Sequence, residues 1–435
     1  MKLGGKSGHQ QQATDPKDNY SSWRVVSLAE VTRECRSRNN GQLDDKLLCG
    51  VLKYHGLVPM RERVKGDSTD RCKVVSPNAF AYNPMRLNIG SIARNAADYS
   101  VMVSPDYVVF QTDPERLLPN YLDHVRHSGL WQSYVGATGD GSVRVRIYYD
   151  QLSHFQLPLP PLPEQQKIAD ILTAVDDKLD VVARQIETTQ TLKKGLMQTL
   201  FSRGVGTQDA HSSWIPHTKF KVSELGEIPS AWMVTTVGEV CEVKGGKRLP
   251  KGETLTEENT GHPYIRVTDM FMGGVDTAGI LYVPSHVQAT IARYTISKDD
   301  IFISVAGTLG LVGIVPEELD GANLTENADK LTDIKINRDY LFYCLCSDAI
   351  QDLIAREATS NAQPKLALTR IREFSFPLPP DEEQARIATI LVSVDEKLRL
   401  LSTKRESYLS LKRGLMQKLL TGEWRVKLDS PSGTA

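Results

Sequence analysis

The sequence predicts an α+β protein of two mixed domains joined by two long helices, in a pseudo-twofold repeat. Three observations predict this class: a duplicated motif, a long apolar stripe of helical period in each copy, and strand-like runs separated by turn residues before each copy. The 435 residues suffice for two or three domains. With 40% hydrophobic and 24% charged residues, the composition is globular and excludes a collagen-like or wholly disordered chain.

The charge balance and the cysteine content limit how the chain can contact nucleic acid and indicate the cellular compartment in which it folds. Lys and Arg number 52 against 53 Asp and Glu, so any contact with nucleic acid must use local basic surfaces. Six scattered cysteines indicate a reducing compartment, the cytoplasm, and Cys344 and Cys346 lack the second pair that a zinc site needs, so we expect no metal. The most apolar stretch, 301–316, is shorter than the roughly 18 to 20 residues of a membrane span, so we expect no membrane association.

One repeat organises the chain. The segment PLPPLPEQQKIADILTAVDDKL from Pro158 recurs as PLPPDEEQARIATILVSVDEKL from Pro377, and LKKGLMQTL from Leu192 recurs as LKRGLMQKL from Leu411 at the same offset. A fainter repeat opens each half, in which WRVVSLAEV and WMVTTVGEV share the aromatic residue, the apolar alternation and the closing Glu-Val. The chain is therefore two copies of one unit, each a block of roughly 130 to 150 residues followed by a Pro-rich hinge and a helix.

The repeat sets the expected domain boundaries. They are a disordered polar tail (1–20), a first block (21–157), a first helical spacer (158–205), a linker (206–226), a second block (227–376), a second helical spacer (377–428) and a C-terminal tail (429–435).

Each spacer carries the apolar stripe of a coiled coil. Apolar residues alternate by three and four positions, and a helix of about 38 residues, about 57 Å long, is too narrowly apolar to be stable alone. We expect each helix to pack on the other, and we expect Glu164 and Glu383 to complement the dipoles at the helix starts. The residues expected in the seam and in partner docking are Ile168, Leu172, Val175, Leu179, Gly195, Leu196, Ile387, Leu391, Val394, Leu398, Gly414 and Leu415.

Two residue types interrupt both stripes at equivalent positions. Gly195 and Gly414 each cost about 1 kcal/mol in a helix, and their recurrence favours a close approach of another helix over a tolerated weak spot. Lys193 and Lys412 are explained equally well by register control and by an ion pair with a partner's carboxylate. Both interpretations of the lysines stay open.

Strand-like runs dominate both blocks. In the first we expect strands at Val74-Val75, 99–103 and 107–110 and one helix over 119–131. In the second we expect strands at 264–267, 280–283, 301–305 and 311–315 and one helix over 340–356. Beyond the first few residues the two blocks differ strongly in sequence.

Basic residues cluster locally in each block. Arg36, Arg61, Arg63 and Lys65 lie in the first block, and Lys244, Lys247 and Arg248 lie in a Gly-rich stretch of the second. A solvated charged face is the simpler interpretation of such clusters. In loops of two duplicated modules on a rigid spacer, however, they are candidate contacts to phosphates and bases.

Motifs for catalysis are incomplete. Gly5-Lys6-Ser7 lacks the earlier glycine and the preceding strand of a phosphate-binding loop. Tyr82-Asn83-Pro84-Met85 lacks the second proline and the aromatic residue of an adenine methyltransferase motif, and no hydrolase elbow or metal pattern is present. We expect no catalytic residue in this chain.

The doubled motif resembles the specificity subunit of type I restriction-modification systems. The resemblance spans about 22–428 and rests on Pro-Leu-Pro-Pro, Glu-Gln, Ile-Ala, Ile-Leu, Asp-x-Lys-Leu and Lys-x-Gly-Leu-Met-Gln, each present twice. The start of the second block, from Ile228 to Arg248, and the run Tyr264-Ile265-Arg266-Val267-Thr268-Asp269 also resemble that family, as does Tyr82-Asn83-Pro84-Met85-Arg86. The resemblance adds Asn83, Arg86, Arg266 and Thr268 to the candidate DNA contacts.

The resemblance implies two target-recognition domains joined by antiparallel helices, each domain reading one half of a split site in double-stranded DNA. It further implies two methyltransferase (modification) subunits that hold S-adenosylmethionine, and restriction subunits that use ATP and Mg, with no cofactor in this chain. Two alternatives are the specificity subunit of a related system with a fused methyltransferase and nuclease, and an enzyme in its own right. A purely structural coiled-coil protein is a further alternative.

Overall fold

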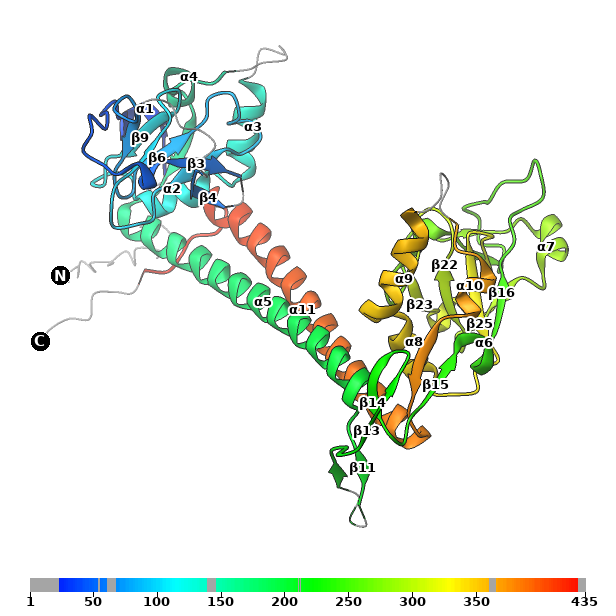
Figure 1. The fold of residues 1–435 in the computed structure, drawn as a ribbon. Helices are drawn as coiled ribbons and strands as arrows, with labels where there is room; N and C mark the ends of the chain where they lie inside the picture. Colours follow the sequence, from blue (N-terminus) through cyan, green and yellow to red (C-terminus); the bar gives the residue numbers. More distant parts are fainter. Residues whose placement is uncertain are drawn as a thin grey trace, which may run out of the picture. The chain divides into compact units, whose positions relative to one another are not determined.

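The computed structural model describes residues 23–53, 55–60, 68–138, 146–209, 211, 213–359 and 365–428. The chain divides into two compact units, one of Met1–Ala183 with Lys404–Ala435 and one of Arg184–Thr403. Each unit holds one block of helices and strands and a part of each long helix, α5 (Leu162–Arg203) and α11 (Asp381–Leu420) (Figure 1). The predicted α+β class with two long helices is confirmed.

The first block is built from two layers of short strands and from helices. Its strands are β1 (Arg24–Ser27), β2 (Thr32–Glu34), β3 (Cys49–Leu52), β4 (Gly56–Pro59), β5 (Lys73–Val75), β6 (Phe80–Tyr82), β7 (Ile92–Arg94), β8 (Val101–Val103), β9 (Val108–Thr112) and β10 (Gln156–Leu159), and its helices are α1 (Leu28–Val31), α2 (Pro119–Val125), α3 (Gly129–Ala137), α4 (Tyr149–Ser153) and the 3-10 helix η2 (Asp45–Leu47). One sheet is antiparallel in the order β2-β9-β6-β7. Strands β3 and β4 pair, β5 and β8 pair, and a parallel bridge from Leu48 to Met102 connects the two pairs.

The second block repeats this topology. Its strands are β15 (Met233–Thr236), β16 (Glu242–Gly245), β17 (Pro263–Ile265), β18 (Met270–Phe271), β19 (Gly274–Val275), β20 (Leu281–Tyr282), β21 (Thr295–Ile296), β22 (Ile301–Ser304), β23 (Val312–Ile314), β24 (Ala322–Leu324), β25 (Ala328–Thr332) and β26 (Ser375–Leu378), and its helices are α6 (Val237–Val240), α7 (Ser285–Ile291), α8 (Arg338–Leu345), α9 (Asp348–Thr359), α10 (Leu368–Arg372) and the 3-10 helices η3 (Val267–Asp269) and η4 (Glu317–Leu319). The sheet order β16-β25-β22-β23 matches β2-β9-β6-β7, and β20-β17-β24-β21 matches the β4-β3-β8-β5 layer. The same frame therefore recurs under two different sequences.

The central strands lie between two hydrophobic layers. In β6, Phe80 and Tyr82 pack with the helices, whereas Ala81 packs with Val75 and Val103 of the second layer. In β22, Ile301 and Ile303 face the helical core and Phe302 faces the other sheet. Residues 80–82 and 301–303 are apolar or aromatic at successive positions because both faces of these strands are buried.

Each block has two short helices where the sequence predicted one. The helix predicted over 119–131 is α2 followed by α3, because Ser128 caps a new helix by accepting a hydrogen bond from the backbone N–H of Trp131 at 3.3 Å. The helix predicted over 340–356 is α8 followed by α9, with the break at Ser347, whose hydroxyl bonds the Cys344 carbonyl oxygen at 2.6 Å. The predicted strands are confirmed in place, with ends that differ by up to two residues.

The long helices run antiparallel within each unit. In the first unit the start of α5 contacts the end of α11, where Lys412 Nζ lies 2.5 Å from Asp176 Oδ1. In the second unit the end of α5 contacts the start of α11, where Lys193 Nζ lies 2.6 Å from Asp395 Oδ1. Of the two interpretations of the seam lysines, the ion pair with a carboxylate of the other helix is therefore the one observed.

The predicted seam residues are buried to different degrees. Ile168, Leu172, Ile387 and Leu391 are fully buried and pack on the block of their own unit as well as on the other helix. Further along, burial is nearly complete at Val175 and Val394 and partial at Leu179, Leu196, Leu398 and Leu415. The apolar stripe is thus partly a seam between helices and partly a contact between helix and block.

The close helix contact predicted at Gly195 and Gly414 is not made within the described residues. Both are exposed, and a Cβ on either would meet no described atom within 4 Å. Within the chain as described, neither glycine is required by a close helix contact. A side chain would fit at both positions.

The segment expected to be a linker, 206–226, holds one small hairpin and begins a second, which ends at Pro229. They pair β11 (Thr207–Gln208) with β12 (Trp214–Ile215) and β13 (Phe220–Ser223) with β14 (Gly226–Pro229). The tails expected at 1–20 and 429–435 lie outside the described residues. Among the helices that are described, none has the length and apolar character to cross a membrane.

Candidate nucleic-acid interface

The second block brings the ends of three strands to one edge. Because β16 and β22 both pair antiparallel with β25, they are parallel and end at the same edge of the sheet. Strand β17 is parallel to β24, and the backbone N–H of Thr325, just after β24, donates to the Ile265 carbonyl at 3.1 Å. The turn 325–327 is therefore bordered by the loops that follow β16, β17 and β22.

The loop after β16 is fixed to this turn by its backbone. The Lys247 N–H donates to the Leu324 carbonyl at 2.8 Å, and the Tyr264 hydroxyl donates to the Lys247 carbonyl at 3.0 Å. A Cβ on Gly246 would lie 2.1 Å from the Thr325 carbonyl oxygen, so the close approach requires glycine. The loop presents its side chains from a rigid backbone.

Two predicted contacts, Lys247 and Arg248, project from that loop. Lys247 is exposed, and its Nζ lies 5.8 Å from the centre of the Tyr294 ring, a cation–π distance. The Arg248 side chain is 74% exposed, and its Nε lies 3.2 Å from Glu326 Oε1. Because exposed ion pairs are weak, Arg248 can exchange this carboxylate for a phosphate or a base.

Arg266 and Thr268 lie at the same edge but differ in availability. The Arg266 guanidinium donates to both carboxylate oxygens of Asp269, at 2.9 and 2.6 Å, and to the Gly279 carbonyl at 2.9 Å. Such a bidentate pair holds Arg266 in place and makes it a support of the loop. Thr268 is exposed on η3.

Lys244 lies apart from this group. Its ammonium pairs with Glu242 at 2.5 Å and with Asp333 at 3.6 Å, beside the outer strand of the sheet. The hydrogen bond to Glu242 raises the pKa of Lys244, so the lysine stays charged and engaged with acidic neighbours. The structure does not group it with Lys247 and Arg248.

The first block has the equivalent edge. Strands β2 and β6 both pair antiparallel with β9, so Arg36, after β2, and Asn83 and Arg86, after β6, emerge at one edge. Arg36 is 79% exposed at its side chain and pairs with Glu34 at 2.6 Å. The Asn83 side-chain oxygen accepts the Met85 N–H at 3.0 Å, which shapes the turn that exposes Arg86. Arg61, Arg63 and Lys65 lie outside the described residues.

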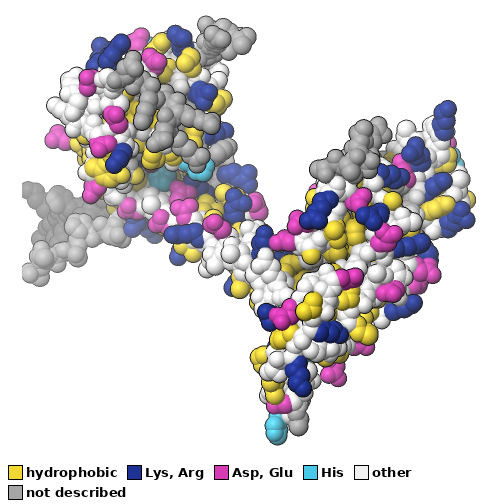
Figure 2. Space-filling view, viewed as in Figure 1, with side chains coloured by type: hydrophobic (Ala, Val, Ile, Leu, Met, Phe, Trp, Pro, Cys, Tyr) yellow, Lys and Arg dark blue, Asp and Glu magenta, His cyan; other side chains and the backbone are white. Residues whose placement is uncertain are grey.

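Acidic partners of the basic residues were missed from the sequence. Glu34 and Glu326 each hold an exposed arginine of the candidate interface. On the face that Figure 2 shows, basic and acidic side chains are interspersed. No sequence signal marks Glu326, because it is far from Arg248 along the chain, whereas Glu34 lies only two residues before Arg36.

Glu164 and Glu383, the buried carboxylates at the two helix starts, were expected only to complement the helix dipoles, but each also accepts hydrogen bonds from side chains of its own unit. Glu383 accepts hydrogen bonds from Trp232 Nε1 at 2.7 Å, from His217 Nε2 at 3.0 Å, and from the backbone N–H groups of Val205 and Gly206 at 2.9 and 3.0 Å. We call these groups the Glu383 cluster.

Its counterpart in the first unit is Glu164, which binds Trp23 Nε1 at 2.9 Å and Arg425 Nε and Nη2 at 2.7 and 2.8 Å. The repeated Trp and Glu of the sequence are thus bonded to each other in both copies. The repeat gave a signal for this contact, since a Trp opens each half and a Glu starts each long helix, although the two are 141 residues apart in the first copy and 151 in the second.

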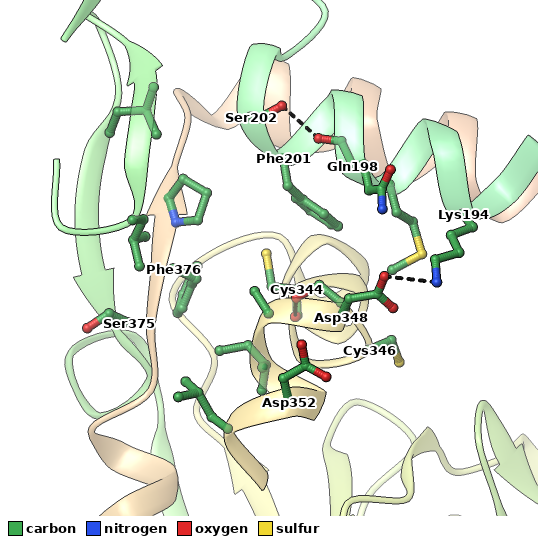
Figure 3. A pocket seen from close by; sticks show the side chains of 18 of the residues that line it. Lys194, Gln198, Phe201, Ser202, Cys344, Cys346, Asp348, Asp352, Ser375 and Phe376 are labelled. Atoms are coloured by element: carbon green, nitrogen blue, oxygen red, sulfur yellow. Dashed lines mark hydrogen bonds and ion pairs between the residues drawn. The ribbon is translucent and has the colours of Figure 1, made fainter. Parts of the chain in front are cut away.

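A cleft of about 810 Å3 lies beside the end of α5 in the second unit. Its wall includes the side chains of Phe201, Cys344 and Phe376, and Lys194 on its rim pairs with Asp348 at 3.2 Å (Figure 3). Burial raises the pKa of Cys344 beyond the range of a reactive thiol. Apolar walls and a rim of both charges suit a protein segment better than DNA.

The described residues contain no group of three or more His, Cys, Asp or Glu side chains placed to hold a metal ion. The features that recur in both units are instead the duplicated frame, the loops at one edge of each block and the paired carboxylates.

Comparison with known proteins agrees with this geometry. The family profile described as "Type I restriction modification DNA specificity domain" matches residues 97–190 and 229–408. The chain is 28% identical over 416 residues to the type I restriction enzyme MjaVIII specificity subunit of Methanocaldococcus jannaschii, covering 93% of each chain, and 32% identical over 288 residues to the putative MjaX specificity subunit of that organism, covering 65% and 62%. The fold is similar to the crystal structure of the S subunit of a type I system from M. genitalium, with a TM-score of 0.58, 19% identity and coverage of 94% and 98%. The chain belongs to the family of type I restriction-modification DNA specificity subunits.

Proposed function

We propose that each block reads one half of a split DNA sequence and that the two long helices hold the blocks at a set separation. The observation that carries this proposal is the repeated two-layer frame, which presents different loop side chains at the same edge in each block. Equivalent frames with different loops suit two readers of two different half-sites, because base contacts specify the sequence whereas phosphate contacts position the protein.

In this proposal the chain is a non-catalytic subunit. The helices dock two methyltransferase subunits, which hold S-adenosylmethionine, and restriction subunits with ATP and Mg join the same complex. The predicted seam residues that are only half-buried, among them Leu179 and Leu398, leave apolar surface on the helices for such partners. The scattered free cysteines support an assembly that works in the cytoplasm.

The test is long-read mapping of methylated adenines in the host genome, with the gene for this chain intact and then deleted. Loss of one split motif with a fixed gap supports the proposal and gives the recognised sequence. An unchanged methylome, with the chain expressed and its partners present, contradicts it.

Two alternatives are separated by simple measurements. A related system with a fused methyltransferase and nuclease would show one large catalytic partner by subunit mass after native purification. An enzyme in its own right would bind S-adenosylmethionine or a nucleotide as the isolated chain, which the proposed function does not expect.

A further inference from the structure

A single joint connects three elements in the second unit. Lys193 of α5 pairs with Asp395 of α11 at 2.6 Å, and the same carboxylate accepts a hydrogen bond from the Tyr343 hydroxyl of α8 at 2.7 Å. The Lys193 Nζ also lies 5.3 Å from the centre of the Tyr343 ring. We call these three residues the second joint. They come from one long helix, from the other long helix and from the block itself.

The first unit contains the equivalent joint with one different residue. Lys412 of α11 pairs with Asp176 of α5 at 2.5 Å. From α2 of the block, His124 places Nε2 3.0 Å from Thr173 Oγ1 and Nδ1 3.9 Å from Asp176 Oδ2. These residues form the first joint, in which histidine takes the place of tyrosine. Because the arrangement recurs in both units, we treat it as a structural feature of the repeated unit.

Each block thus makes polar contacts with its helices at two levels, at the helix start and at the joint, in addition to the apolar packing described above. On α11 the Glu383 cluster and Asp395 are separated by 395 − 383 = 12 residues, about 18 Å along a helix. Apolar packing near the helix start is non-directional, whereas the polar contacts of the joint, made farther along α11, restrain the tilt of the block against both helices. The lysine interrupts an apolar stripe to make this attachment, which a purely apolar residue would not make.

We propose that the two joints set the orientation of each reader on the helices and thereby the number of base pairs between the half-sites. This rests on the proposed function. About 2 Å of freedom at one end of an 18 Å base tilts a block by about 6°, and across a domain about 35 Å wide this moves its loops by about 4 Å. That movement is close to the rise of one base pair, about 3.4 Å. Lys193, Asp395, Tyr343 and their counterparts are therefore positioning residues.

The test is Lys193→Met in the complete complex with the methyltransferase subunits. Methionine keeps the apolar stem of the lysine in the seam, and Asp395 is 35% exposed at its side chain and still accepts the Tyr343 hydroxyl, so water can solvate the remaining carboxylate and the fold is retained. The matched control is Lys194→Met, which removes the neighbouring lysine and its 3.2 Å surface pair with Asp348 but leaves the joint intact. The substrates are duplexes with both half-sites constant and the gap varied by one base pair at a time.

We expect the Lys193→Met complex to recognise the same half-sites as wild type. It should methylate duplexes whose gap is longer or shorter by one base pair about tenfold faster than wild type, because the free energy of one charged hydrogen bond corresponds to about that loss of discrimination. Lys194→Met should keep the wild-type profile. Tyr343→Phe, which removes only one hydroxyl, should relax the gap in the same direction and decides the matter if Lys193→Met does not assemble.

A folded Lys193→Met complex with the wild-type gap profile would overturn the proposal, and so would Tyr343→Phe with that profile if the first variant does not assemble. Failure of the proposed function looks different, because the wild-type complex itself would then methylate without requiring both half-sites.

Discussion

Replacing Glu383 with glutamine removes one oxygen from a carboxylate that is 2% exposed and accepts hydrogen bonds from Trp232, His217 and two backbone N–H groups. Glutamine can keep its oxygen on the two backbone groups, but its NH2 must then face the indole N–H at the position that now lies 2.7 Å from Trp232 Nε1. One charged hydrogen bond is lost and one buried donor is left without an acceptor.

These two effects sum to about 4 kcal/mol of unfolding free energy. For a unit of about 200 residues, this corresponds to a decrease in Tm of roughly 8 to 16 °C. The assay is calorimetric unfolding of the full chain, following the transition of the second unit. The neighbouring Glu382→Gln is the matched control, because Glu382 is exposed on the same first turn of α11 and its loss removes the same charge near the helix dipole. Equal Tm values for the two variants would refute the assignment of Glu383 as the residue that fastens the block to the helix.

Three further predictions test other features. Leu391→Asp, at a fully buried position of α11, should lower the unfolding free energy of the second unit by about 4 kcal/mol. Leu400→Asp, at a position 60% exposed on the same helix, should have little effect on thermal unfolding. Similar losses of stability in the two variants would contradict the seam assignment. Arg248→Ala should weaken DNA binding by the complex and lower the slope of log affinity against log salt concentration by about one if Arg248 contacts a phosphate, or relax the specificity for one half-site if it contacts a base. Lys244→Ala is the control away from the edge. Unchanged affinity, salt slope and specificity in Arg248→Ala would remove Arg248 from the interface. Burial lowers the pKa of His124 from 6.5, so below pH 6.5 the unfolded chain binds more protons than the folded chain, and the first unit should lose stability as the pH falls towards the folded pKa. Replacing His124 with Tyr, the residue found in the second joint, should flatten this dependence of stability on pH, measured by unfolding at a series of pH values. A dependence equal to that of wild type would exclude His124 as its source.

The repeated motif and the helical period predicted the long helices, their starts and the α+β class, because these features depend on local sequence. The breaks at Ser128 and Ser347 were missed, since a serine hydroxyl that bonds a nearby backbone group competes with a helical pattern that otherwise continues through it. The described chain places no neighbour at Gly195, so its predicted role in partner docking stays a prediction.

The sequence predicted several residues of the candidate interface, but it did not predict how the fold brings them together. Lys247 and Arg248 follow a strand end in the sequence, but their common edge with Arg266 depends on β17 and β24 being parallel, a pairing between residues about 60 apart. Whether Arg248 is free or held depends on Glu326, which the fold brings to it. Side chains that meet only through sheet topology leave no pattern in the sequence.

The contact between Glu164 and Arg425 joins residues 261 positions apart, so the first unit is closed by the last part of the described chain. On a ribosome adding roughly 5 to 20 residues per second, Arg425 is made about 13 to 52 seconds after Glu164. The second unit is contiguous in the sequence and can complete itself during synthesis, whereas the first must wait with Glu164 lacking its arginine. A message cut short before Arg425 would therefore yield a chain in which the buried Glu164 keeps its bond to Trp23 but lacks its cationic partner.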